Sequence, residues 1–332
     1  MKILVTGGAG YVGSMVSRAL LARGDEVRVL DSLLYGGASL LDLYEEERFS
    51  FVRGDIRSAQ TVTNALAGMD AVVHLAALVG DPLCSRQPAL AKEVNQDASL
   101  QLVDLSRRRG IQRFIFASTC SNYGRMPDPS VSLTEESELQ PVSLYAQTKV
   151  AVERALLAGS PSASPTVTVL RFATVFGLSP RMRFDLTVNE FTMELLVKRT
   201  LTIYGEQFWR PYIHVRDAAQ AVRLVLEASE EKIQRQAFNA GDTSQNYQKG
   251  SLAELIRSQI GDQCQIERIH KTEDPRDYRV CFDKIKRELG FTMTRTVQAG
   301  VREIIAAISN GLFTDFDNPI YSNEKWVEAV SV

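Results

Sequence analysis

The sequence predicts an α/β fold: a doubly wound parallel sheet of the Rossmann type, joined to a smaller mixed α/β lobe. Short apolar runs alternate with longer amphipathic stretches through the first third of the chain, which is typical of βαβ units. A glycine-rich turn at residues 7–13 joins the first apolar run to the first amphipathic stretch. The 332 residues exceed what one hydrophobic core usually covers, and this predicts the second lobe.

The alternation predicts the order of the elements. Strands are expected at residues 2–6, 26–31, 50–53, 71–76, 113–117 and 166–171. Apolar residues at helical spacing predict helices at 11–22, 59–66, 88–108 and 144–157, and later at 218–226, 251–260 and 296–308. A short apolar run at 237–240 indicates that the chain crosses between lobes more than once. We expect one domain at 1–175 with a return at roughly 211–242, and the smaller lobe at 176–210 and 243–332.

Composition excludes several classes of protein. With 45% hydrophobic and 23% charged residues the chain is typical of a globular protein, and 38 Lys and Arg against 40 Asp and Glu predict no nucleic-acid partner. Four scattered cysteines and three histidines predict neither a disulfide framework nor a metal site. No apolar run is long enough for a membrane span, and the apolar start is too short for a signal peptide. We expect a cytoplasmic protein without a membrane partner.

The glycine turn carries the clearest functional signal. It follows the pattern G-x-x-G-x-x-G and lies between a predicted strand and a predicted helix. Glycines permit a tight turn and a close approach of backbone, while a helix N-terminus presents N–H groups to a pyrophosphate. A glycine turn without a ligand is the alternative. The residues expected to contact a dinucleotide here are Gly7, Gly10, Tyr11, Val12 and Gly13.

Asp31 ends the second predicted strand, at the distance from the glycines where an acidic side chain accepts hydrogen bonds from an adenosine ribose. Its carboxylate would repel a 2′-phosphate, and the neighbouring Ser32 is not an arginine. These two positions favour NAD over NADP as cofactor. A surface Asp that caps a turn is the alternative interpretation.

Tyr145 and Lys149 are four residues apart in a predicted helix, so their side chains share one face. A lysine ammonium stabilises a phenolate and is expected to lower the phenol pKa, as a tyrosine that acts as a base requires. Tyr321 and Lys325 have the same spacing without any nucleotide motif. The spacing alone therefore leaves an ordinary exposed helix pair open.

Hydroxyl groups gather in residues 116–124, directly after the fifth predicted strand. The segment contains Ser118, Thr119, Cys120 and Ser121. Ligands bind outside the carboxyl ends of strands in open α/β sheets, so these hydroxyls suit a polyol substrate. A structural turn built on Ser and Thr side chains is equally compatible with the segment.

Together these motifs resemble the extended short-chain dehydrogenase/reductases, specifically the NAD-dependent sugar-nucleotide epimerase/dehydratase family that includes UDP-glucose 4-epimerase. The resemblance runs over nearly the whole chain. Its further markers are Gly54-Asp55-Ile56, His74-Leu75-Ala76-Ala77, Asn95, Arg210-x-Tyr212-Ile213-His214-Val215-x-Asp217 and Arg276-Asp277.

The resemblance implies roles for these positions. Residues 1–175 would bind NAD, the smaller lobe would bind a nucleotide-diphosphate sugar, and Tyr145 would remove a proton from a sugar hydroxyl gripped with Thr119 while hydride leaves the same carbon. Lys149 would bind the nicotinamide ribose. The other implied cofactor contacts are Asp55, Ile56, Leu75, Ala76, Ala77 and Asn95, and the implied substrate contacts are Thr174, Asn189, Arg210 and Arg276.

One departure bears on the reaction. The 4,6-dehydratases of this family carry an Asp-Glu pair directly after the catalytic Thr, whereas this chain has Cys120 and Ser121. An epimerase is therefore favoured. The alternatives are a dehydratase that uses Cys120 as acid or base, a 4-ketoreductase, and a dinucleotide-binding protein without turnover. The family's usual homodimer would pair the helices predicted at 88–108 and 144–157.

Overall fold

The computed structural model describes residues 1–126, 128, 131–159, 165–274 and 276–330. It confirms the doubly wound α/β fold. Seven parallel strands form one sheet in the order β10-β6-β5-β4-β1-β2-β3, so the strand order reverses between β1 and β4. The strands are β1 (Lys2–Thr6), β2 (Glu26–Asp31), β3 (Phe49–Arg53), β4 (Ala71–His74), β5 (Arg113–Thr119), β6 (Thr166–Phe172) and β10 (Gln236–Ala240).

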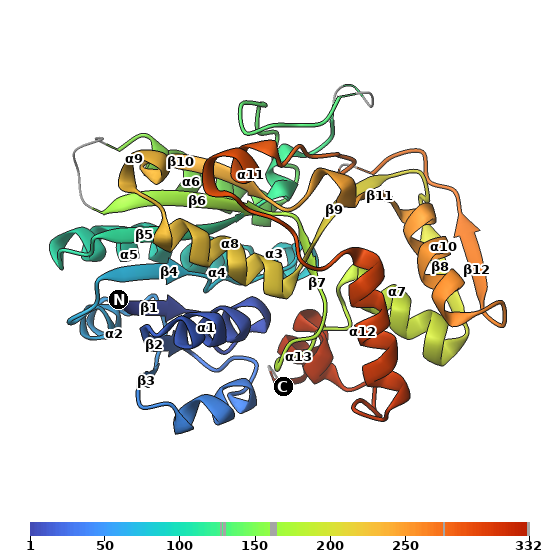
Figure 1. Ribbon diagram of the computed structural model, residues 1–332, viewed down its shortest axis with the longest axis horizontal. Helices are drawn as coiled ribbons and strands as arrows, with labels where there is room; N and C mark the ends of the chain where they lie inside the picture. The colour runs from blue at the N-terminus through green and yellow to red at the C-terminus, as the bar shows by residue number, and fades with distance from the viewer. Residues whose placement is uncertain (127, 129–130, 160–164, 275, 331–332) are drawn as a thin grey trace.

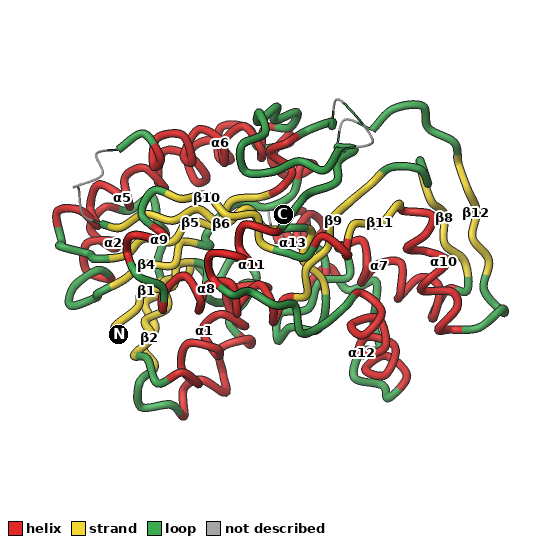
Figure 2. Tube along the Cα trace, turned by 45° about the horizontal axis from the view of Figure 1, so that its top comes forward, coloured by secondary structure: helices red, strands yellow, loops and turns green. Residues whose placement is uncertain are grey.

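Helices cover both faces of this sheet (Figures 1 and 2). Alternate strand residues point to opposite faces, so Ile3 and Val5 pack into one apolar cluster and Leu4 into another. The first face carries α1 (Tyr11–Arg23), α8 (Val215–Glu227) and α11 (Asp283–Leu289), and the second carries α2 (Ala59–Ala65), α5 (Ala98–Arg108) and α6 (Leu144–Leu157). Short α3 (Asp81–Arg86), α4 (Pro88–Lys92) and α9 (Glu230–Ile233) and the 3₁₀ turns Ala38–Glu45 and Cys120–Tyr123 complete this part.

The helix expected at 88–108 is confirmed, because residues 88–108 are helical without a break. A π-helical turn, Glu93–Asp97, separates α4 from α5. Asn95 in this turn is fully buried, where its side chain accepts a hydrogen bond from the N–H of Leu78 and donates one to the carbonyl of the same residue. The π turn thus directs a polar side chain inward onto the loop that follows β4, a contact that apolar periodicity does not register.

The smaller lobe has two small sheets and a separate core. β7 (Thr174–Phe176), β9 (Trp209–His214) and β11 (Asn246–Gln248) form one sheet, and β8 (Thr200–Tyr204) pairs in parallel with β12 (Gln265–Ile269). Phe176, Leu252 and Val301 lie in its apolar cluster. Its helical segments are α7 (Thr187–Met193), the π turn Glu194–Lys198, the 3₁₀ turns Thr243–Gln245 and Pro319–Tyr321, α10 (Lys249–Ile260), α12 (Val297–Ser309) and α13 (Asn323–Val330).

The chain passes repeatedly between the two parts. After β9, which belongs to a small sheet, it returns with α8 and β10 to the large sheet before entering the small lobe again at β11. Over the described ranges, no helix has both the length and the apolar character needed to cross a membrane. Nor does that part of the chain bring together three His, Cys, Asp or Glu side chains that could hold a metal ion.

Asp217, in the first turn of α8, ties this helix to the segment before α12. Its buried carboxylate accepts hydrogen bonds from the N–H and hydroxyl of Thr294 and from the N–H of Arg295. We expect Asp217→Ala to lower the free energy of unfolding by about 2–4 kcal/mol, because buried donors are left unsatisfied. Chemical denaturation measures the loss. Asp262→Ala, at an exposed Asp, is the control, and equal losses for the two variants would contradict the tether.

Candidate active site

The glycine turn lies at the carboxyl ends of β1 and β2, next to the residues that follow β4. Gly7 has a φ of +73°, which favours glycine, and a Cβ atom there would lie 2.7 Å from the backbone N of Ala76. A Cβ atom at Gly13 would lie only 2.0 Å from the carbonyl oxygen of Gly7. Gly10 is the N-cap of α1, and no described side chain caps this end of the helix. The first turn of α1 therefore offers backbone N–H groups to an anionic ligand.

Asp31 lies against the same turn. Its carboxylate accepts hydrogen bonds from the N–H of Ala9 at 3.0 Å and from the N–H of Leu33 at 2.8 Å. Burial raises the pKa of this carboxyl group, and the two N–H donors partly oppose the rise. Asp31 thus stabilises the turn after β2, and its carboxylate also lies beside the glycines, where the sequence predicts a ribose. The neighbouring Ser32 is exposed.

A buried polar chain shapes the loop after β4. The hydroxyl of Ser99 donates to the carbonyl of Asn95, so it accepts a hydrogen bond from Nε2 of His74, whose Nδ1 accepts from the hydroxyl of Thr6. Burial lowers the pKa of His74 to about 3, which keeps the ring neutral, as this pattern requires. The Thr6 hydroxyl also accepts the N–H of Ala76. This chain of hydrogen bonds therefore holds the start of the loop after β4, at Ala76, in place.

Tyr145 and Lys149 share one face of α6, beside the end of β5. Lys149 is 2% exposed, donates a hydrogen bond of 2.9 Å to the carbonyl of Ala117 and lies 4.8 Å from the centre of the Phe116 ring. Its Nζ lies 5.9 Å from the centre of the Tyr145 ring. Burial lowers the pKa of Lys149 to about 8. The two side chains are thus adjacent, and the exposed-pair interpretation does not describe Lys149.

The expected direction of the Tyr145 pKa is wrong. Burial raises the pKa of the phenol above its ordinary value, Cys84 and Asp81 act in the same direction, and Arg183 acts against them. Removing the ring from water disfavours the phenolate more than the surrounding cations favour it. The four-residue spacing correctly predicted that Lys149 lies beside Tyr145, but it did not predict how far the surrounding residues bury the phenol.

Thr119 and Cys120 follow each other in sequence, but their side chains have different surroundings. The hydroxyl of Thr119 is hydrogen-bonded to that of Ser121 at 2.6 Å, at the carboxyl end of β5. The Cys120 thiol is fully buried and donates a hydrogen bond to the carbonyl of Arg171 on β6. Burial raises its pKa well above the ordinary thiol value. This position argues against Cys120 as an acid or base, because the thiol packs into the core.

Arg210 and Arg276 meet around one carboxylate that the sequence analysis did not single out. Asp274 accepts hydrogen bonds from the guanidinium of Arg210, from Nζ of Lys249 and from the N–H of Arg276. Burial alone would raise its pKa, but Arg210, the Arg276 N–H and Lys249 hold the pKa at about 2. The guanidinium of Arg276 also pairs with Asp81, on α3 of the large-sheet part. No local motif marks this group, because Arg210 and Lys249 are distant in sequence from Asp274.

The remaining candidates have mixed positions. Asn189 is fully buried, with its amide bonded to the N–H of Gly177, the carbonyl of Arg183 and the hydroxyl of Tyr11, so it positions the loop after β7. Ile56 is buried in the core, and the half-buried Asp55 binds Arg57. Val12, Ala77 and Thr174 are partly exposed near the carboxyl edge.

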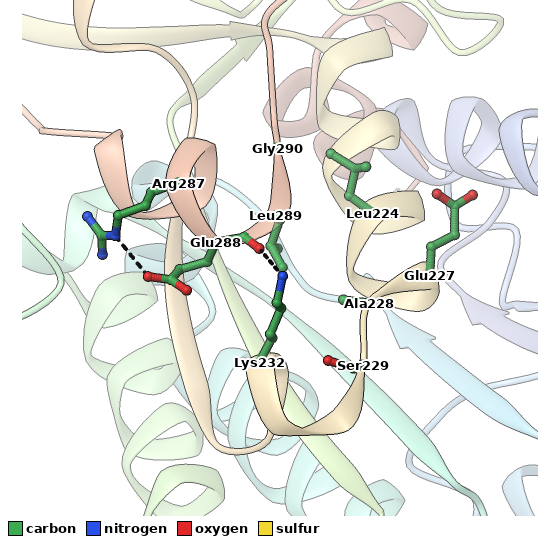
Figure 3. A pocket seen from close by; sticks show the side chains of 9 residues that line it. All are labelled: Leu224, Glu227, Ala228, Ser229, Lys232, Arg287, Glu288, Leu289 and Gly290. Carbon is green, nitrogen blue, oxygen red and sulfur yellow. Dashed lines mark hydrogen bonds and ion pairs between the residues drawn. The ribbon is translucent and has the colours of Figure 1, made fainter.

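A surface hollow lies at the C-terminal end of α8 (Figure 3). Arg113, at the amino end of β5, donates hydrogen bonds to the carbonyls that end α8, so this hollow is at the edge of the sheet opposite the glycine turn. It is not part of the candidate active site. Its lining consists of Leu224, Glu227, Ala228, Ser229, Lys232, Arg287, Glu288, Leu289 and Gly290.

Known proteins share this fold and sequence pattern. A UDP-glucose 4-epimerase from Corynebacterium glutamicum is 30% identical over 312 residues, 89% of this chain and 92% of the relative. A dTDP-glucose 4,6-dehydratase from Streptomyces niveus is 30% identical over 316 residues, 92% of each chain. The crystal structure of the dTDP-glucose 4,6-dehydratase from Streptomyces venezuelae, with NAD bound, has a TM-score of 0.84 at 28% identity and covers 96% of this chain and 100% of its own.

The family model agrees with these relatives. It describes an NAD dependent epimerase/dehydratase family and matches residues 3–241, a span that includes all seven strands of the large sheet and the Tyr145 and Lys149 pair. The sequence-based resemblance is confirmed. The chain is a member of the NAD-dependent epimerase/dehydratase family, whose members act on nucleotide sugars, and its cofactor is NAD.

Proposed function

We propose that the chain is a sugar-nucleotide epimerase, which oxidises a ring hydroxyl transiently and returns the hydride to the other face of the sugar. The observation that carries this proposal is the contrast at the end of β5. Thr119 lies at the carboxyl end of β5, and its hydroxyl is hydrogen-bonded to that of Ser121. The Cys120 thiol is instead buried and donates a hydrogen bond to the carbonyl of Arg171. The two positions that hold an acidic pair in 4,6-dehydratases therefore supply no carboxyl group to remove water.

The chain's own residues would divide the chemistry as follows. NAD supplies the hydride acceptor. Tyr145 takes the proton of the sugar hydroxyl and later returns it, and Thr119 holds the same hydroxyl. Lys149, anchored on the Ala117 carbonyl, keeps a cation beside the phenol and favours its ionised form. Burial raises the pKa of the phenol in the ligand-free chain, so its ionised form depends on the Lys149 cation beside it.

The small lobe would hold the nucleotide diphosphate. Arg210 and Lys249 already lie on one carboxylate, Asp274, and the neighbouring Arg276 reaches Asp81 on α3. A bidentate guanidinium suits a diphosphate oxygen pair. Arg276 would exchange its contact with Asp81 for the substrate, which would also loosen a link between the lobes.

The test is incubation of the purified protein with a panel of nucleotide sugars, with products analysed by mass and by NMR. An epimerase leaves the mass unchanged and inverts one ring carbon. Loss of one water would make the chain a dehydratase, and a stoichiometric demand for reduced cofactor would make it a ketoreductase. A cytoplasmic location and a homodimer through α4, α5 and α6 stay predictions, the second checked by light scattering.

Tyr145→Phe should reduce turnover by about two to four orders of magnitude, because the general base is removed while the ring remains. NAD binding, followed by calorimetry, should persist. Tyr321→Phe is the matched control, because Tyr321 has the same spacing to a lysine and packs on Phe184 and Phe313 instead. Equal activity of the two variants would show that Tyr145 is not the base.

The wild-type protein should bind NAD at least about tenfold more tightly than NADP, because the Asp31 carboxylate would lie close to a 2′-phosphate of like charge. Asp31→Asn keeps an acceptor for the turn but removes the charge, so it should reduce the ratio of the NADP dissociation constant to the NAD dissociation constant. Calorimetry with both cofactors measures it. Tighter binding of NADP to the wild type would mean that Asp31 does not face the ribose.

Cys120→Ala should retain most of the turnover and cost about 1 kcal/mol of stability, since a buried thiol is lost from the core. The measurement combines steady-state kinetics with thermal unfolding. Accumulation of a keto sugar without release of product would contradict the structural role. That result would instead assign Cys120 a proton-transfer step in a dehydration or carbon epimerisation.

A further inference from the structure

Arg181, in the loop that follows β7, carries a buried charge without matching acceptors. Arg181 is 6% exposed, and Nε and one terminal nitrogen of its guanidinium are buried without a hydrogen-bond partner among the described residues. The guanidinium carbon lies 4.3 Å from the centre of the Tyr35 ring. In the same part of the chain that the structure describes, the buried hydroxyl of Tyr35 has no hydrogen-bond partner either. Such a group is costly to fold unless an anion completes it.

The loop that carries Arg181 is attached to the glycine turn. The hydroxyl of Tyr11, the first residue of α1, donates a hydrogen bond of 2.6 Å to the carbonyl of Gly177. Ser179 donates to the carbonyl of Tyr11 and is bonded to Ser14. Tyr35 itself follows β2 by a few residues, on the loop that begins at Asp31. The unpartnered guanidinium therefore lies between the N-terminus of α1 and the segment after β2.

Neighbouring charged groups do not supply the acceptors that the Arg181 guanidinium lacks. Asp185 acts on Arg181 through its charge, but its oxygens bind the guanidinium of Arg183 and the N–H of Asn323. Burial, with Arg183 acting in the same direction, lowers the pKa of Arg181 to about 10. Two buried arginines thus share one carboxylate, and Arg183 has the direct contact.

The C-terminal helix covers this region. In α13, the indole N–H of Trp326 donates to the carbonyl of Leu34, and Val327 packs in the apolar cluster that contains Tyr35 and Tyr145. Arg86 on α3 forms ion pairs with Glu324 and Glu328. Water is therefore kept away from one side of the Arg181 and Tyr35 pair, which strengthens a charge interaction formed there.

We propose that Arg181 binds the pyrophosphate of NAD, on the side of the phosphates opposite the backbone N–H groups of the glycine turn. The inference rests on the proposed placement of NAD at that turn. A guanidinium matches two phosphate oxygens at once, and the contact with the Tyr35 ring restricts its position before the ligand arrives. This role is distinct from that of Arg210 and Arg276, which gather at Asp274 in the small lobe.

Arg181→Met tests the proposal, because Met fills similar space without charge. We expect the melting temperature of the ligand-free protein to stay the same or rise, since an unpaired buried charge is removed. The dissociation constants for NAD and ADP-ribose should rise at least about tenfold by calorimetry. Binding of adenosine and of UDP or dTDP should not change. Arg183→Met is the matched control, and it should lower the melting temperature because Asp185 loses its partner.

Several results would overturn the inference. A lower melting temperature of ligand-free Arg181→Met with unchanged NAD affinity would make Arg181 a structural residue. Weaker UDP or dTDP binding with unchanged NAD affinity would place its guanidinium on the substrate diphosphate. Weakened binding of adenosine as much as of NAD would show a general distortion of the site. A wild-type protein that bound no NAD would refute the proposed cofactor site, and this inference with it.

Discussion

The close approach of Gly13 to the carbonyl of Gly7 is the constraint on which the rest of the site depends. A side chain at either position would collide with backbone, at the Gly7 carbonyl or at Ala76. This approach lets α1 start a few residues after β1, with Gly7 beside Ala76 after β4. Asp31 then reaches Ala9, and Tyr11 reaches Gly177, so both flanking loops take their positions from the turn.

A second constraint lies beneath the Tyr145 and Lys149 pair. Glu153, on α6 one turn after Lys149, pairs with Arg171 on β6 and accepts from Ser118 on β5. Arg171 also donates to the hydroxyl of Tyr123. These buried bonds fix α6 against the sheet, so the position of Lys149 relative to the strand end is set by ion pairs and not by helix propensity. They also explain the place of Cys120, whose thiol fills the core beside this network.

Charge organises the boundary between the two parts of the molecule. Asp274 collects cations in the small lobe, while Asp81 of the large-sheet part pairs with Arg276. A diphosphate that enters between them would compete with carboxylates for the same guanidinium groups. Binding of the substrate diphosphate would therefore be coupled to the contact between the lobes. Arg181 would instead bind the cofactor, at the glycine turn.

The sequence by itself determined the large sheet, most helix boundaries and the motifs at the carboxyl edge of that sheet. The periodic spacing of apolar residues in strands and helices and the spacing of the glycines are local properties of the chain. It did not predict β7, β8, β9, β11 and β12, because they lie outside the regular alternation of strands and helices that marks the large sheet. Tertiary structure alone decided that Cys120 turns inward, that burial raises the Tyr145 pKa and that Arg181 meets Tyr35. Burial and partner choice depend on residues far apart in the chain, and no local pattern encodes them.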